Sequence, residues 1–205
     1  MTRHRIVAMS LTVLAAMLFG AARLHQADRS PLPDCEWCGA MDAPEGELPS
    51  VLTIAGPEEP GERIILRGVV YETDGETPAP DVLMYAYHTD ATGVYRRDGD
   101  ETGNGRRHGE LRGWLRTDEA GRYEIRTIKP APYPNRREPA HIHVTLTPPG
   151  GEEHWVESVL FADDSLVTQR ERRRSERAGR FAWVIGLTSN EGGALVGERA
   201  IRLRE

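Results

Sequence analysis

An alternation of apolar and polar residues dominates the chain from residue 48 onward. Six stretches of 7 to 11 residues carry it, and turns rich in Asp, Gly and Pro separate them: residues 63–73, 81–89, 121–128, 141–147, 154–161 and 181–188. A period of two places successive side chains on opposite faces of a β-strand. Six or more such strands predict an all-β domain, a β-sandwich with long loops and little helix.

The composition agrees with this prediction. The chain has 14 prolines, 21 glycines and 39% hydrophobic residues, which suits a turn-rich β domain better than a helical bundle. Only residues 168–180 read as a helix. The connector from Arg96 to Gly113 is longer than a hairpin needs, and loops of this length are usually functional or disordered. The net charge of −6 gives no support for nucleic-acid binding.

The N-terminus has the pattern of an export signal. Basic residues in "MTRHR" precede 17 uncharged, mostly apolar residues that end in Gly20-Ala21-Ala22, a small-residue cleavage site. We therefore expect residues 1–22 to be a signal peptide, 23–47 a linker, and 48–205 the β-sandwich domain of a periplasmic or extracellular protein. The alternative is an uncleaved anchor, because the run is only slightly shorter than the roughly 20 residues that span a bilayer. In that case the N-terminal segment would be the contact with the membrane.

Two cysteines, Cys35 and Cys38, lie in the expected linker. After export, an oxidising compartment favours a disulfide between them. A redox-active CxxC would need a thioredoxin-like setting, which the proline-rich flanks do not provide, and a zinc site would need two further ligands nearby. A local disulfide is the preferred interpretation. It closes a small loop, so we expect its loss to change the stability of the domain only mildly.

The stretch "PAHIHVTL" places two histidines two residues apart on one expected strand. His141, His143 and Thr145 should share one face, while the apolar residues between them face the core. The two Cβ atoms would lie about 6.6 Å apart, at roughly 3.3 Å per strand residue, so both rings can reach one metal ion. Two polar residues on a solvated face would give the same pattern.

Tyr133 precedes this strand in the turn "PAPYPN", between prolines that fix the backbone. A tyrosine in such a turn often serves only packing. However, a phenolate is a hard anionic ligand, and a set of Tyr and His suits Fe(III) better than zinc.

The ordered motifs "DATGVYRRD", "LRGWLRTDEAGRYEIRTIKPAPYPN", "PAHIHVTL" and "LFADDSL" resemble the intradiol ring-cleavage dioxygenases, the family of the protocatechuate and catechol dioxygenases. The resemblance covers residues 69–166, about half of the chain. It implies a β-sandwich of the prealbumin-like type with a non-haem Fe(III) site. In that family the G-x-Y pattern, the P-Y-P turn and the P-A-H-I-H strand supply the ligands, which correspond here to Tyr95, Tyr133, His141 and His143.

The resemblance also implies a reaction. A catechol-type substrate would chelate the iron and displace Tyr133, which would then help to take up a proton, and O2 would be inserted between the two hydroxyl-bearing carbons. The product would be a muconate-type diacid. Which catechol is the substrate, and in which oligomeric state the protein works, does not follow from the motifs.

Two positions depart from the family pattern. The well-characterised enzymes have an arginine directly before the P-A-H-I-H stretch, where this chain has Glu138 after Arg136 and Arg137. A carboxylate there would repel an anionic catecholate, unless a neighbouring arginine reaches the site. A glutamine of the family corresponds to Ser158. The export signal and the CxxC also set the chain apart, so we expect a divergent exported branch.

Two other classes of protein use similar patterns. A cupin would need a glutamate four or five residues after the second histidine, where this chain has Thr147 and Pro148. The alternative function is a non-catalytic, exported transthyretin-like binding module whose metal site is vestigial. We expect His88 and His108 to be surface or loop residues, and Trp114, Trp155 and Trp183 to serve packing.

Overall fold

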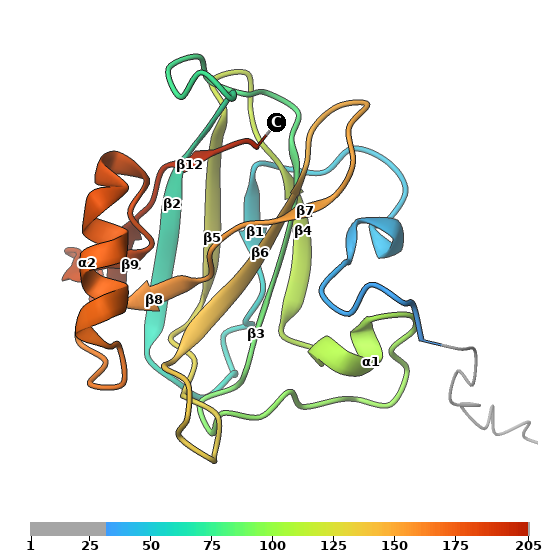
Figure 1. The fold of residues 1–205 in the computed structure, drawn as a ribbon. Helices are drawn as coiled ribbons and strands as arrows, with labels where there is room; N and C mark the ends of the chain where they lie inside the picture. The colour runs from blue at the N-terminus through green and yellow to red at the C-terminus, as the bar shows by residue number, and fades with distance from the viewer. Residues whose placement is uncertain (1–31, 205) are drawn as a thin grey trace, which may run out of the picture.

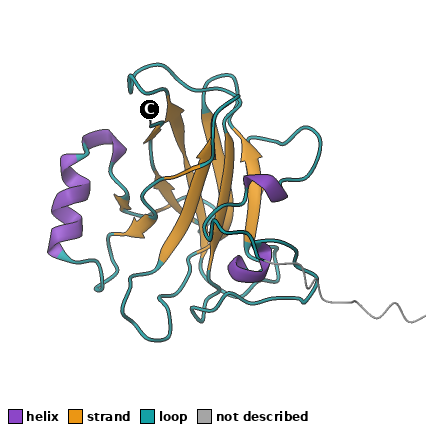
Figure 2. Ribbon diagram, turned by 45° about the vertical axis from the view of Figure 1, so that its right-hand side comes forward, coloured by secondary structure: helices purple, strands orange, loops and turns teal. Residues whose placement is uncertain are grey.

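The computed structural model describes residues 32–204. It forms two six-stranded sheets that face each other (Figures 1 and 2). The first sheet has the order β1-β5-β2-β11-β10, with β12 also pairing with β2, and the second has the order β4-β3-β6-β8-β9, with β7 also pairing with β6. The strands are β1 (Val51–Thr53), β2 (Arg63–Tyr71), β3 (Leu83–His88), β4 (Arg112–Arg116), β5 (Arg122–Ile128), β6 (His141–Thr147), β7 (His154–Trp155), β8 (Val159–Phe161), β9 (Val184–Ile185), β10 (Thr188–Ser189), β11 (Leu195–Glu198) and β12 (Ile201–Arg202). The predicted β-sandwich is confirmed.

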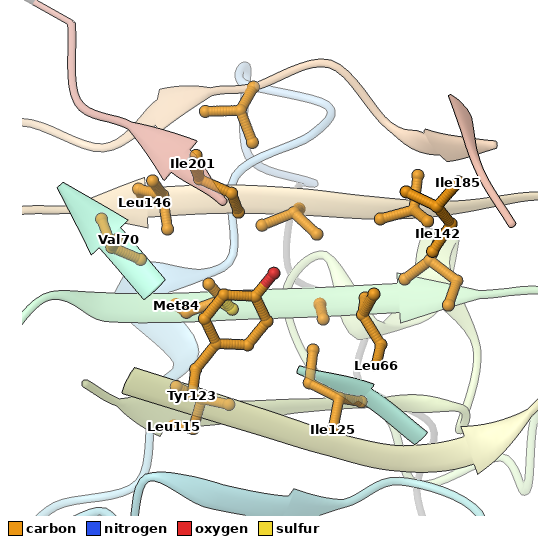
Figure 3. Packing of buried hydrophobic residues seen from close by; sticks show 14 of the residues in the cluster. Leu66, Val70, Met84, Leu115, Tyr123, Ile125, Ile142, Leu146, Ile185 and Ile201 are labelled. Atoms are coloured by element: carbon orange, nitrogen blue, oxygen red, sulfur yellow. The ribbon is translucent and has the colours of Figure 1, made fainter. Parts of the chain in front are cut away.

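The core fills the space between the two sheets (Figure 3). On β6, Ile142, Val144 and Leu146 are buried in this core, as the alternation predicts. Leu66 of β2 and Ile125 of β5 come from the facing sheet. Because these side chains alternate along each strand, the histidines of β6 lie on the opposite face, away from the core.

Two predicted strands are interrupted. Residues 154–161 form β7 and β8 instead of one strand, and residues 181–188 contain β9 and the start of β10. The first break is a bulge. Thr145 pairs with Trp155, but Ile142 pairs with Val159, so an advance of three residues along β6 is matched by four residues along the β7–β8 segment. A bulge redirects the side chains around it. Here it lies beside His143.

Helix is scarce. The helix predicted at residues 168–180 is α2 (Gln169–Arg177), and the side chains of Thr168 and Glu171 form a capping box at its start. A short α1 (Gly105–His108) and two 3₁₀ turns, η1 (Ala40–Asp42) and η2 (Gly179–Phe181), complete the fold. Among the described residues, no helix is both long and apolar enough to cross a membrane.

Cys35 and Cys38 are joined by a disulfide. The segment around them, coloured blue in Figure 1, lies on the same side of the molecule as α1. It is anchored there by hydrogen bonds, among them those from Asn104 Nδ2 to the carbonyl oxygens of both cysteines. The predicted signal peptide, residues 1–22, lies outside the described residues.

Candidate metal centre

Tyr95 reaches the site through a tight loop after β3. The Asp90 carboxylate accepts hydrogen bonds from the backbone N–H groups of Thr92 and Val94 and so closes the loop. Gly93 has a positive φ of 84°, and a Cβ there would lie 2.1 Å from the carbonyl oxygen of Pro132. Only glycine allows this close approach. The loop is therefore pressed against the segment that carries Tyr133.

The histidines are presented by β6, and other hydrogen bonds occupy their outer nitrogens. His141 Nδ1 donates to the carbonyl oxygen of Pro139 at 2.7 Å, and His143 Nδ1 lies 3.3 Å from Ser158 Oγ, on the bulge. These contacts orient the rings, so that His141 Nε2 faces Tyr133 Oη and His143 Nε2 faces His141 Nε2. Such partners of the distal nitrogen are usual for metal-binding histidines.

The structure brings together the four side chains that the motifs indicate. Consecutive donor atoms are 2.8 Å apart from Tyr95 Oη to Tyr133 Oη, 3.2 Å from Tyr133 Oη to His141 Nε2, and 2.9 Å from His141 Nε2 to His143 Nε2. Two ligands that each bind a metal at about 2.1 Å, at right angles, lie about 3.0 Å apart. The spacing of this four-residue donor cluster therefore fits a metal ion, and its two phenols suit a hard one.

Burial shapes the protonation of the donor cluster. Burial raises the pKa of the Tyr95 hydroxyl, and the hydrogen bond with Tyr133 raises that pKa further. Burial also raises the pKa of the Tyr133 hydroxyl. Burial, followed by the charge of His141, lowers the pKa of His143 to about 3. Without a metal ion both phenols are therefore neutral at pH 7, and His143 already has its ligating form. In the described part of the chain, no three His, Cys, Asp or Glu side chains gather in a way that would offer a metal another site.

A pocket of about 340 Å³ opens on His141 and His143. Its walls include Trp155, Trp183 and Leu160, together with the carboxylate-bearing Glu138 and the ion pair of Arg174 with Glu157. Arg136 and Arg137 are exposed and are not among the lining residues. Larger hollows lie elsewhere, two of them around Arg199 and one beside Arg116, and none of the four donor residues lines them.

Sequence reasoning missed part of the surroundings. The prediction that His88 and His108 are surface or loop residues is wrong, since both are buried, at 1% and 4% exposure. His88 hydrogen-bonds to Thr89 and Thr127, so that the buried ring is satisfied. None of the motifs points to Tyr87, although its ring stacks on that of His143. The aromatic alternation "MYAYH" is the signal that could have drawn attention to this strand.

The β-sandwich gathers two phenols and two imidazoles beside a pocket, a set of side chains whose chemistry suits a hard metal ion. The family model described as "Dioxygenase" matches residues 43–180, well over half of the chain. The protein belongs to the intradiol ring-cleavage dioxygenases.

Individual relatives are distant. Catechol 1,2-dioxygenase 2 of Acinetobacter lwoffii is 26% identical over 156 residues, which is 62% of this chain and 54% of that protein. The chain thus spans about half the length of this relative. The dioxygenase domain of a carbohydrate-binding fusion protein from Streptomyces sp. SirexAA-E has a TM-score of 0.56 at 21% identity, over 82% of this chain and 97% of the other. For 3-chlorocatechol 1,2-dioxygenase of Rhodococcus opacus 1CP the TM-score is 0.57 at 24% identity, over 78% of this chain and 66% of the other.

Proposed function

We propose that the protein cleaves a catechol-type aromatic with O2, between its two hydroxyl-bearing carbons, at a non-haem Fe(III) site held by Tyr95, Tyr133, His141 and His143. The product would be a muconate-type diacid. The observation that supports this most is the donor cluster, in which four side chains of suitable chemistry are spaced as ligands of one ion. Membership of the family supports the same reaction.

When bound, Fe(III) would act as a Lewis acid and a template that activates the chelated catecholate toward O2. The protein residues would orient the ring and move protons. Tyr133 is the residue we assign to accept a proton from an incoming catechol at its Oη atom, because that atom lies between Tyr95 Oη and His141 Nε2. Trp155, Trp183 and Leu160 would supply apolar walls for the aromatic ring.

Glu138 bears on which catechol is accepted. Its side chain lines the pocket, while Arg136 and Arg137 do not, so no arginine of this turn offsets its charge there. We propose that neutral catechols are better substrates than carboxylated ones, because the carboxylate of Glu138 would repel a second anion.

We also propose that the protein works in the periplasm or outside the cell. The N-terminal residues have the pattern of an export signal, and a Cys35–Cys38 disulfide suits an oxidising compartment.

The test is the visible spectrum and iron content of the purified protein after addition of Fe(III), together with product formation from catechol. Phenolate ligands give a red to brown charge-transfer band, as in the family. Tyr95→Phe should weaken the band and lower the bound iron, while Tyr71→Phe, in the other sheet, should change neither. A protein that fills with zinc and shows no visible band would overturn the assignment and favour a non-catalytic binding module.

A further inference from the structure

A stack of three rings lies behind one of the expected iron ligands. Tyr87 is the direct neighbour of His143 across the β3–β6 pair, and the two ring centroids lie 4.4 Å apart at an angle of 18°. On its other side Tyr87 stacks on His108, at 3.7 Å and 11°. Tyr87 and His108 are 5% and 4% exposed. The imidazole of His143 therefore has a closely packed aromatic wall behind it.

His108 connects this stack to the disulfide loop. Its Nε2–H donates to the carbonyl oxygen of Glu36, between the two cysteines, at 2.7 Å. Its Nδ1 then accepts a hydrogen bond from the Tyr85 hydroxyl at 2.8 Å. Both ring nitrogens are satisfied, so the plane of the imidazole is fixed in the buried stack.

Asn104 binds the same loop. Its side-chain amide donates to the carbonyl oxygens of Cys35 and Cys38, at 2.6 and 2.8 Å, and Asn104 is fully buried. With Glu36, three carbonyl groups of the disulfide loop thus face the 104–108 segment. The disulfide joins two cysteines that are three residues apart in the sequence, so it holds these carbonyls in one arrangement.

The segment that follows the disulfide is fixed to the second sheet as well. The carboxylate of Glu153 accepts hydrogen bonds from the backbone N–H groups of Gly39 and Ala40, and from the hydroxyl of Thr145 on β6. The indole of Trp114 on β4 donates to the carbonyl oxygen of Gly39. The disulfide loop is therefore attached both to the 104–108 segment and to the sheet that carries His143.

We infer that Tyr87 and His108 are positioning residues for His143, and that the Cys35–Cys38 disulfide acts through them on the iron site. This inference rests on the proposed function for its iron readouts. Opening the disulfide frees the three carbonyls, loosens His108 and so removes the rigid support behind Tyr87. His143 then samples more ring orientations, which weakens its hold on the metal. Residues that orient a metal ligand commonly change metal affinity about 10- to 100-fold when they are replaced.

The variants separate the steps of this coupling. Tyr87→Leu removes the ring, Tyr87→Phe keeps it, and Tyr71→Leu is the matched control in the other sheet. His108→Phe keeps a ring against Tyr87 but cannot bond to Glu36 or Tyr85. Cys35→Ser with Cys38→Ser opens the crosslink, and each variant is compared with wild type by thermal unfolding to exclude general loss of the fold.

The first readout uses the metal-free protein and does not depend on the proposed function. Hydrogen exchange in the peptides that contain residues 104–108 and 141–143 should become about tenfold faster in the double cysteine variant, with β2 and β5 unchanged. If exchange in both peptides stays at the wild-type rate, the coupling is refuted. A protein that takes up no iron would refute the proposed function and leave this comparison valid.

The second readout is the rate of Fe(III) release to a chelator, together with the charge-transfer band. We expect about tenfold faster release in Tyr87→Leu and a smaller change in Tyr87→Phe, with a shifted band in the former. In the His108→Phe background, opening the disulfide should add little, because the link is already cut. Fully additive effects, or equal effects of Tyr87→Leu and Tyr71→Leu, would show that the disulfide and the stack do not act on His143.

Discussion

The hydroxyl oxygens of Tyr95 and Tyr133 lie 2.8 Å apart, although 38 residues separate them in the sequence. The loop that carries Tyr95 reaches this position by packing its backbone against Pro132, one residue before Tyr133. The meeting of the two phenols therefore depends on a contact between two loops.

Gly93→Ala should break that contact. The added methyl group would overlap the carbonyl oxygen of Pro132, and φ at this position is 84°. We expect a loss of about 2 kcal/mol in the free energy of unfolding and less bound iron. The control is Gly150→Ala, at φ of 69° with nothing within 4 Å of the added carbon. Urea unfolding and iron analysis measure both, and equal effects of the two variants would contradict the role of the loop contact.

Iron affinity should rise with pH. Burial raises the pKa of both Tyr95 and Tyr133, so binding as phenolates releases protons that the metal-free protein holds at neutral pH. Because His143 is already neutral, the protons released on binding are those of the two phenols. Iron affinity should therefore rise by up to about 100-fold per pH unit. Competition with a chelator between pH 6 and 8 measures the slope. The slope of log affinity against pH, which counts the protons released, should fall by about one in Tyr95→Phe. An unchanged slope would argue against Tyr95 as a ligand.

Replacing Glu138 should change substrate preference. We expect neutral catechol to be cleaved faster than 3,4-dihydroxybenzoate, and Glu138→Arg to improve cleavage of the carboxylated compound about fivefold, since solvent screens this exposed carboxylate. Glu138→Gln should give a smaller gain. Values of kcat/KM for both substrates provide the measurement. Two results together would instead show that an arginine sets the substrate preference. The order of the two substrates would be unchanged in Glu138→Arg, and Arg136→Ala or Arg137→Ala would lose cleavage but keep iron.

Acid should destabilise the fold through buried histidines. Burial lowers the pKa of His88 and of His108 to about 4, against about 6.5 in an unfolded chain. Below pH 6.5 the unfolded state binds protons that the folded state does not, so stability is lost as the pH falls from 6.5 toward 4. Each histidine should contribute about 1 kcal/mol per pH unit. Urea unfolding of wild type and His88→Gln between pH 5 and 6.5 tests this, and equal slopes would contradict it.

The local sequence pattern was sufficient to predict much of the secondary structure of this protein and its family. The alternation in "HIHVTLT" gives β6 its bounds and its buried face, because a strand's two faces are set by neighbouring residues alone. The ordered motifs indicated the family, and residues 168–180 were correctly expected to contain the helix α2. Very short strands such as β1 and β12 carry too few residues for alternation to be visible, and β4 begins inside the stretch expected to be a connector.

Tertiary structure decided what surrounds the expected metal ligands. The bulge beside β8 arises from pairing with β6, and it is this pairing that places Ser158 next to His143. The burial of His108 and its stacking on Tyr87 depend on a long loop that folds back over the sheet and onto the disulfide segment. Ligand chemistry and strand periodicity, which are local properties, pointed to His141, His143 and Tyr133 as candidate metal ligands, and the resemblance added Tyr95. Which residues hold those ligands in place was decided by contacts between segments far apart in the chain, and no local pattern encodes such contacts.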